Sequence, residues 1–177
     1  MLARSFRFVA LRPAHRSLAV VGALSLTLAI IVAGCGGSAK HQSQEVSGTG
    51  FRFSAPAGWV VSRGLLGVTA THSDQFVRVS TFPLAKPYSP ARFAAVATEL
   101  KTRMNALVAQ SGGKVQGTAV VTAAGIKAHV WRIVTSGNLD EYTFVLKGLR
   151  EYQLLCHRPA GGDDSACSLL VQSLQLG

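Results

Sequence analysis

Apolar and polar residues alternate along much of the chain beyond residue 50. Phe51, Phe53 and Ala55 are separated by Arg52 and Ser54, a period of two that is typical of a half-buried strand. Further strands are predicted in segments rich in β-branched and aromatic residues. These begin at Trp59 and then cover 68–72, 76–82, 115–123, 126–134, 141–147 and 151–157. The links between consecutive strands are short and contain glycine or polar turn residues, so the strands are expected to pair antiparallel.

A long helix is predicted between the early and the late strands. Ser89 supplies a capping hydroxyl, and Pro90 suits the first helical position. Apolar residues then recur at three- and four-residue spacing as far as Val108. Gly112 and Gly113 end the pattern, and the apolar stripe is expected to face the core.

A second, short helix is predicted near the C-terminus, capped by Asp163 or Asp164. Its stripe consists of Ala166, Leu169, Leu170, Ser173 and Leu174. Apolar residues on both faces of the strand 126–134 indicate that both sides of the sheet are partly covered. The predicted fold class is α+β, an antiparallel sheet of about six to eight strands packed by one long helix and a short C-terminal helix.

The first 34 residues have the three parts of an export signal. Four arginines come first without any acidic residue, an uncharged and mainly apolar run covers Ser17 to Gly34, and small residues precede Cys35. The segment Val32-Ala33-Gly34-Cys35 resembles a bacterial lipobox. In lipoproteins with this motif the signal is cut before the cysteine, which becomes the lipidated first residue.

The resemblance implies a signal peptide at 1–34, a lipidated Cys35 within a flexible tether at 35–49, and a single domain at 50–177. Such a lipoprotein is held in the cell membrane by acyl chains such as palmitate and faces the extracytoplasmic side. Two alternatives stay open. Ser17 to Gly34 would span roughly 27 Å as a helix, so an uncleaved membrane anchor is possible, and so is ordinary secretion.

The charge of the chain narrows the classes of partner that are expected. The chain carries 18 basic and 8 acidic residues, and without the four signal arginines 14 basic residues remain, a net charge of +6. This balance favours anionic neighbours such as lipid headgroups or acidic wall polymers. The basic residues are scattered between Lys40 and Arg158 without a run, and nucleic acid is not an expected partner of an exported protein.

Cys156 and Cys167 form an even pair in a domain expected outside the cytoplasm, which predicts a disulfide. Closing a loop of about a dozen residues would stabilise the fold by roughly 3 kcal/mol on the chain-entropy model. The alternative is a metal site that adds His157 and Asp163 to the two cysteines. Its spacing matches no familiar zinc pattern, so no metal is expected.

The segment Phe51-Arg52-Phe53-Ser54-Ala55-Pro56-Ala57-Gly58-Trp59 resembles the opening F-x-F-x-x-P-x-x-W of PsbP/Mog1-like domains. A glycine-containing segment at 125–128, a hairpin ending at 152–154 and a terminal helix with Ser173 are similar too. The resemblance covers roughly 50–176 and implies a sheet between helices, an α/β/α sandwich. The better-known members are non-catalytic binding or assembly modules, at photosystem II or on a nuclear-transport GTPase. None of their contact residues can be matched to this chain.

No established catalytic or phosphate-binding motif occurs in the chain. His41, His72, His129 and His157 lack a second histidine at ligand spacing, and we expect them to be surface or hydrogen-bonded strand residues. Asp140 and Glu141 are expected to be a solvent-exposed pair at a hairpin end. No enzymatic activity and no cofactor are therefore predicted.

The candidates for ligand binding are Trp59, Trp131 and Arg132, although a tryptophan in a small sheet is typical of the core. Arg63, Arg78 and Arg132 would form an anion site if the fold brought them together. The predicted function is a membrane-anchored extracytoplasmic module for binding or assembly, with a protein partner at the cell envelope. The alternative is a small-ligand carrier or sensor with a cleft between sheet and helix.

Overall fold

The structure is a computed structural model that describes residues 42–177. The predicted signal peptide, Cys35, His41 and the tether up to residue 41 lie outside the described residues. In chain order the elements are β1 (Ser43–Gly48), β2 (Phe51–Pro56), β3 (Val60–Arg63), β4 (Gly67–His72), β5 (Gln75–Pro83), a 3-10 turn (Pro90–Arg92), α1 (Phe93–Ser111), β6 (Lys114–Ala123), β7 (Ile126–Thr135), β8 (Asn138–Lys147), β9 (Arg150–Pro159), α2 (Ser165–Ser173) and β10 (Gln175–Leu176).

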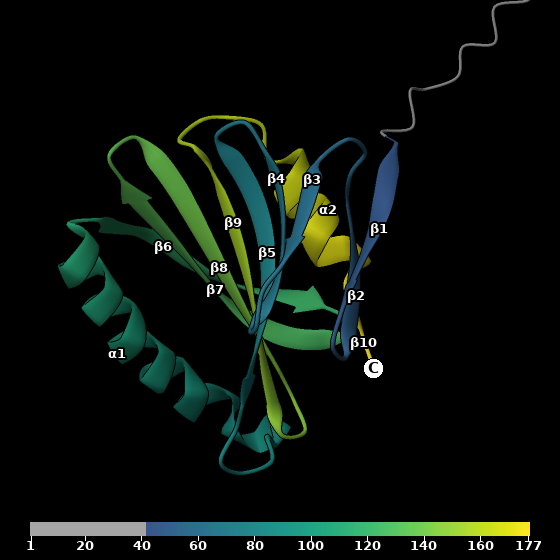
Figure 1. Ribbon diagram of the computed structural model, residues 1–177. Helices are drawn as coiled ribbons and strands as arrows, with labels where there is room; N and C mark the ends of the chain where they lie inside the picture. The colour runs from purple at the N-terminus through teal and green to yellow at the C-terminus, as the bar shows by residue number, and fades with distance from the viewer. Residues whose placement is uncertain (1–41) are drawn as a thin grey trace, which may run out of the picture. The chain divides into compact units, whose positions relative to one another are not determined.

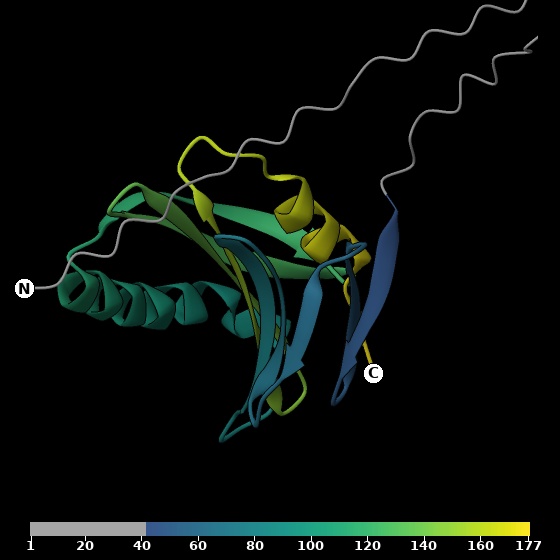
Figure 2. The same cartoon turned by 45° about the horizontal axis from the view of Figure 1, so that its top comes forward.

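The strands form two antiparallel sheets (Figure 1). The larger sheet has seven strands in the order β3-β4-β5-β9-β8-β7-β6, and the smaller has three in the order β1-β2-β10. The helix α1 lies on one side of the larger sheet and α2 on the other (Figures 1 and 2). The predicted α+β class, with an antiparallel sheet, one long helix and a short C-terminal helix, is confirmed. The separation of β1, β2 and β10 into a second sheet was not predicted.

The predicted tether at 35–49 is wrong where the structure describes it, because Ser43–Gly48 is the strand β1. This strand pairs with β2 over its whole length, from Ser43 opposite Pro56 to Gly48 opposite Phe51. Val46 is the only buried residue of β1, at 1 % exposure. The rest of the strand is polar or small, which is why its sequence resembles a linker. The Gln44 amide adds hydrogen bonds to the carbonyl oxygens of Pro56 and Trp59, at 3.2 and 2.7 Å. The domain therefore begins near Ser43.

The core consists of two hydrophobic clusters. The larger joins residues of α2 and the small sheet to the larger sheet, among them Phe53, Val77 and Leu170. The smaller lies beneath α1 and contains Val96, Leu100, Met104, Trp131, Ile133, Phe144 and Leu146. Both clusters, and the strand pairings of both sheets, lie within residues 42–177. This segment carries its own core, and we expect it to fold alone.

The helix α1 is attached to the sheet by packing and by one ion pair. As predicted, Val96, Leu100 and Met104 of its apolar stripe are buried. The helix ends at Gly112, whose φ of 66° is left-handed and suits glycine. Arg103 donates from both terminal nitrogens to the carboxylate of Glu151 on β9, at 2.8 and 2.9 Å. Because Glu151 is 5 % exposed, this pair fixes the helix over the sheet at a buried point.

The helix α2 is connected at both ends. The Asp163 carboxylate accepts hydrogen bonds from the backbone N–H and the hydroxyl of Ser165, at 3.0 and 2.6 Å. Of the two predicted caps, Asp163 thus supplies the side-chain bonds, and Asp164 makes no side-chain cap bond. At the other end the Ser173 hydroxyl accepts a hydrogen bond from the backbone N–H of Ser54 on β2, at 2.8 Å. Among the described residues, no helix is long and apolar enough to cross a membrane.

Candidate functional site

Trp131 and Arg132 are neighbours on β7 and therefore point to opposite faces of the larger sheet. Trp131 lies in the cluster beneath α1 and is 6 % exposed. Arg132 faces α2 and pairs across the sheet with Glu141. The two ligand-binding candidates thus belong to two separate clefts, one on each side of the sheet.

The first cleft lies between α1 and the edge strand β6 and has a volume of about 600 Å³. Its lining includes Ala97, Lys101 and Asn105 of α1, Val115 and Val120 of β6, and Trp131. Val115 and Val120 are 37 % and 56 % exposed, so apolar surface is open to solvent there. The predicted cleft between sheet and helix therefore exists beside Trp131, and its volume is in the range of small-molecule sites.

His129 lines the same cleft but has a structural partner. Its Nε2–H donates to the backbone carbonyl oxygen of Phe93, at 3.1 Å, and its ring stacks on the Phe93 ring with centroids 3.9 Å apart. The histidine thereby connects β7 to the first turn of α1. This confirms the prediction that His129 is a hydrogen-bonded strand residue.

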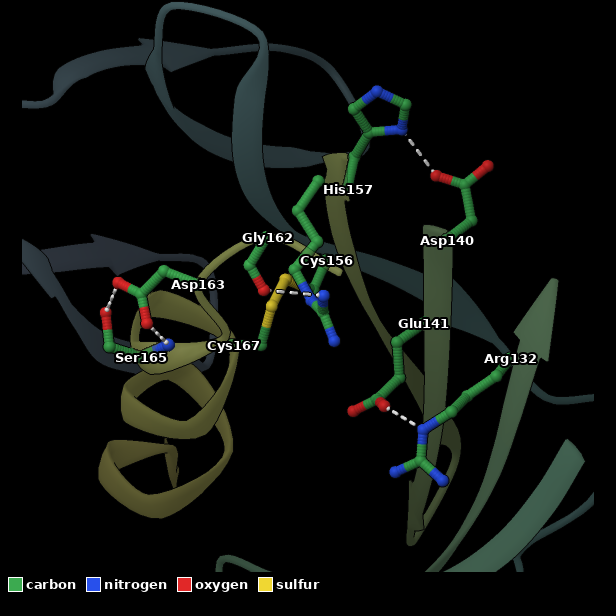
Figure 3. Close-up of a disulfide and its surroundings, with 10 residues drawn as sticks. Arg132, Asp140, Glu141, Cys156, His157, Gly162, Asp163, Ser165 and Cys167 are labelled. Carbon is green, nitrogen blue, oxygen red and sulfur yellow. Dashed lines mark hydrogen bonds and ion pairs between the residues drawn. A yellow bond between two sulfur atoms is a disulfide. The ribbon is translucent and has the colours of Figure 1, made fainter. Parts of the chain in front are cut away.

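The second cleft lies between α2 and the other face of the sheet, with a volume of about 360 Å³. Arg132 and Glu141 form an ion pair in its lining, with the Arg132 Nε 2.6 Å from a Glu141 oxygen (Figure 3). Arg158 also lines it and donates to the carbonyl oxygen of Gly162, at 2.9 Å. An anionic ligand at Arg132 would have to compete with the Glu141 carboxylate already bound there.

Cys156 on β9 and Cys167 on α2 are joined by a disulfide beside this second cleft (Figure 3). Their Cα atoms are 5.5 Å apart, and the bond ties the last helix to the sheet as predicted. The alternative metal site with His157 and Asp163 is not formed. His157 follows Cys156 on the strand and points to the opposite face, and the described residues contain no group of three potential metal ligands.

The prediction that Asp140 and Glu141 lie together in solvent is wrong. Each binds a partner on a neighbouring strand: Glu141 binds Arg132, and Asp140 accepts a hydrogen bond from the His157 Nδ1–H at 2.6 Å. The Asp140 and His157 side chains are both 23 % exposed, and His157 stacks on Phe76. The register of β8 with β9 places Asp140 opposite His157. Sequence spacing alone does not reveal a cross-strand pair of this kind.

The three candidate arginines do not converge. Arg78 lies in one cross-strand row with Leu155, Tyr142 and Trp131, and so points to the α1 side, opposite to Arg132. Arg63 is on the edge strand β3, five strands from β7 and so about 24 Å away at 4.8 Å per strand. The anion site proposed from these residues is therefore absent from the described structure.

Trp59 has a packing role. It lies in the link between β2 and β3, and its ring stacks on His72 with centroids 6.1 Å apart. It is partly buried against the larger hydrophobic cluster. Of the candidates, only Trp131 and Arg132 line the two clefts.

Comparison with known proteins identifies the fold but not the family. No family model matches the chain, and no curated protein sequence matches it either. Among solved structures, it is similar to the solution structure of cyanobacterial PsbP (CyanoP) from Synechocystis sp. PCC 6803. The TM-score is 0.59, the sequence identity 15 %, and the match covers 82 % of this chain and 99 % of that chain. The domain has a PsbP-like fold.

A second solved structure, from Bacteroides thetaiotaomicron VPI-5482, reaches a TM-score of 0.45 at 14 % identity, over 76 % of this chain and 48 % of that one. This likeness is too low to support an argument. For the PsbP-like domain, the fold is thus given by the likeness to CyanoP. Its clefts and paired charges are known only from its own residues.

One titrating group stands out in the PsbP-like domain. Burial raises the pKa of the Tyr142 hydroxyl on β8, and the nearby Asp140 carboxylate adds to the rise. Arg78 acts in the opposite direction on the same hydroxyl. Strand register places Tyr142, Asp140 and Arg78 on the α1 side of the sheet, next to the smaller core cluster.

Proposed function

We propose that the mature protein is a lipoprotein held in the cell membrane by Cys35, with the PsbP-like domain on the extracytoplasmic side. The segment Val32-Ala33-Gly34-Cys35 and the four preceding arginines support the anchor. The disulfide between Cys156 and Cys167 supports the compartment, because disulfides persist where the surroundings are oxidising.

In this proposal the domain is a non-catalytic module for binding or assembly, with a protein partner at the cell envelope. The observation that carries it is the likeness of the fold to CyanoP over 99 % of that chain. The charges in the clefts support it as well. Arg132 is engaged by Glu141, and His129 by the Phe93 carbonyl, so these side chains hold the fold together and are not poised for chemistry.

A co-purification from membranes tests the proposal. Full-length tagged protein is crosslinked in intact cells, solubilised in detergent and purified with its partners. The control is residues 1–41 of this chain fused to an unrelated domain, which removes proteins recruited by the anchor alone. We expect the same envelope proteins to be recovered repeatedly with the PsbP-like domain and not with the control. Equal recovery by both, or no partner in repeated preparations, would reject the module.

The cleft beside Trp131 favours a second candidate function, a carrier or sensor for a small ligand. Apolar Val115, Val120 and Trp131 line it, and Lys101 adds one positive charge, which fits an amphiphile with one anionic group. Decanoate, an apolar chain with one carboxylate, is a suitable probe. Any ligand at 100 times its dissociation constant raises the free energy of unfolding by about 2.7 kcal/mol.

Thermal unfolding is measured with and without decanoate, and so is Trp131 fluorescence in a Trp59→Phe background. The carrier hypothesis predicts a rise in Tm and a change in emission, both abolished by Val120→Asp, which places a carboxylate in the cleft. Arg52→Gln is a matched control on the small sheet, outside the cleft. A flat response of the wild type across fatty acids of several lengths would remove this candidate.

A further inference from the structure

Three leucines are exposed in two turns at one end of the larger sheet. Leu65 and Leu66 lie in the link between β3 and β4, and Leu149 lies in the link between β8 and β9. Leu65 is fully exposed, and Leu66 and Leu149 are 59 % and 56 % exposed. Single exposed leucines need no explanation, but a group of them on turn tips marks a candidate interaction surface.

The two turns are held against the same strand. The Leu66 carbonyl oxygen accepts a hydrogen bond from the Thr81 N–H, and the Leu149 carbonyl oxygen accepts one from the Leu84 N–H, both at 2.8 Å. Thr81 and Leu84 are at and just beyond the end of β5. Figure 1 shows the turn between β8 and β9 and the segment after β5 projecting together beyond the lower end of the sheet. We call this surface the leucine end. It consists of Leu65, Leu66 and Leu149 and the nearby cations Arg63, Lys147 and Arg150.

Three basic side chains, Arg63, Lys147 and Arg150, flank these leucines. All three are exposed, and among the described residues none of them forms an ion pair. Arg150 lines two hollows at this end, one with Arg63, Leu65 and Leu66, the other with Lys147 and Leu149. No acidic side chain lines either hollow. The leucine end is therefore apolar and positive at once.

The opposite end of the sheet carries four acidic residues against two cations, Lys114 and Arg158, which lie in one cross-strand row there. Asp74 lies in the turn between β4 and β5, Asp140 near the start of β8, and Asp163 and Asp164 in the link between β9 and α2. These are four of the eight acidic residues in the chain. The separation of charge between the two ends orients the domain in the field of a negative surface, with the leucine end foremost.

We propose that the leucine end binds an anionic lipid bilayer directly, with its leucines among the headgroups and its cations against the lipid phosphates. Exposed leucines beside Lys and Arg are the chemistry of interfacial membrane binding. The shape favours a bilayer over a protein. The leucines project on two separate turns. Lipid headgroups can rearrange around such turns, whereas a protein partner needs roughly 800 Å² of complementary surface on each side.

The chain length allows this contact together with a lipid at Cys35. Strand β1 runs from Ser43 to Gly48, which lines the same hollow as Leu65 and Leu66, a rise of about 17 Å at 3.3 Å per residue. The eight residue steps from Cys35 to Ser43 span at most about 28 Å. One membrane can therefore hold both. The inference is nevertheless independent of the anchor, because the leucine end should bind lipid without it.

Vesicle sedimentation of residues 42–177, which lack Cys35, tests the inference. Vesicles of phosphatidylcholine alone are compared with vesicles containing about 30 % phosphatidylglycerol, at low and at physiological salt. We expect binding to the anionic vesicles only, weakened by salt. The variant Leu65→Ser/Leu66→Ser/Leu149→Ser should bind at least tenfold more weakly. The variant Arg63→Gln/Arg150→Gln should lose roughly fivefold in affinity for each cation removed.

Matched controls separate vesicle binding by the leucine end from nonspecific hydrophobic adsorption and from the effect of net charge. Val60→Ser removes an apolar side chain that is 72 % exposed at the far end of β3. Arg78→Gln/Lys114→Gln removes two exposed cations elsewhere. Both controls should bind within about twofold of the wild type, and Tm values should show that all variants fold.

Two results would overturn the inference. One is a wild-type segment that does not bind anionic vesicles. The other is an equal loss of binding in the controls and in the variants of the leucine end. If only the full-length leucine variant loses a co-purified membrane protein, while no form of the segment binds vesicles, the leucine end is a protein-docking surface and the proposal is wrong.

Discussion

Replacing Arg103 with methionine tests how α1 is held on the sheet. The Arg103 guanidinium donates two hydrogen bonds to Glu151 and lies 5.5 Å from the centre of the Phe144 ring. Methionine retains most of the aliphatic packing but leaves the Glu151 carboxylate buried without its partner. The hydrogen bond to Glu151 also raises the pKa of Arg103, against the opposing effect of burial, so the contact favours the charged form.

The magnitude follows from the unequal exposure of the two partners. Breaking a fully buried ion pair costs about 3–5 kcal/mol, and exposed pairs contribute about 0–1 kcal/mol. The Arg103 side chain is 44 % exposed and that of Glu151 7 %, so this pair lies between the two limits. We expect Arg103→Met to lower the free energy of unfolding by about 2 kcal/mol. The double variant Arg103→Met/Glu151→Gln should lose about 1 kcal/mol, since no buried charge remains.

Urea unfolding of residues 42–177 measures this effect. In a Trp59→Phe background the fluorescence reports on Trp131, which lies in the cluster beneath α1. Arg150→Met is the matched control, because Arg150 adjoins Glu151 in sequence but is exposed and should cost less than about 0.5 kcal/mol. The ion pair does not hold α1 in this way if Arg103→Met is as stable as this control, or if the double variant is less stable than Arg103→Met.

Three further outcomes are expected. Replacing Cys156 and Cys167 with alanine should lower the free energy of unfolding by about 3 kcal/mol, because the sequence separation is 11 residues; an unchanged Tm would contradict the disulfide. Burial raises the pKa of Tyr142, so its neutral form stabilises the fold below the unfolded pKa of about 10, and this contribution is lost as pH rises beyond that value. Tyr142→Phe should reduce the alkaline loss of stability, and a tyrosinate absorbance titration with all tyrosines ionising near pH 10 would oppose this. Ser173→Ala removes the acceptor for a backbone amide of β2 and should cost about 1 kcal/mol in urea unfolding, while an exposed serine such as Ser168 should tolerate alanine.

The sequence predicts those parts of the fold that depend on local periodicity. The alternation at Phe51, Phe53 and Ala55 corresponds to buried positions of β2, and the stripe of Val96, Leu100 and Met104 faces the core. The disulfide could be predicted as well, because only Cys156 and Cys167 remain once Cys35 is assigned as the lipidation site. Each of these inferences needs only neighbouring residues or a count.

Features that depend on strand register could not be predicted. Strand β1 has a single buried apolar residue, Val46, so its pairing with β2 has no periodic signal. Arg132 and Glu141 meet because β7 and β8 pair in a particular register, and so do Asp140 and His157 on β8 and β9. The leucine end likewise requires two turns far apart in the sequence to be hydrogen-bonded near the same end of β5. The three arginines of the predicted anion site do not meet. Arg78 and Arg132 lie on opposite faces of the sheet, and Arg63 lies five strands from β7.

The N-terminal residue of the mature protein shows whether the domain is anchored by lipid on the extracytoplasmic side. The protein is purified from the membrane fraction of its own cells, and its first peptide is analysed by mass spectrometry, with Cys35→Ser as the control. We predict a chain that begins at Cys35 and carries the added mass of a diacylglyceryl group, and a Cys35→Ser variant that is neither cut at this position nor acylated. A wild-type chain that keeps residues 1–34, or one recovered without lipid from the soluble fraction, would show that Cys35 is not a lipid anchor.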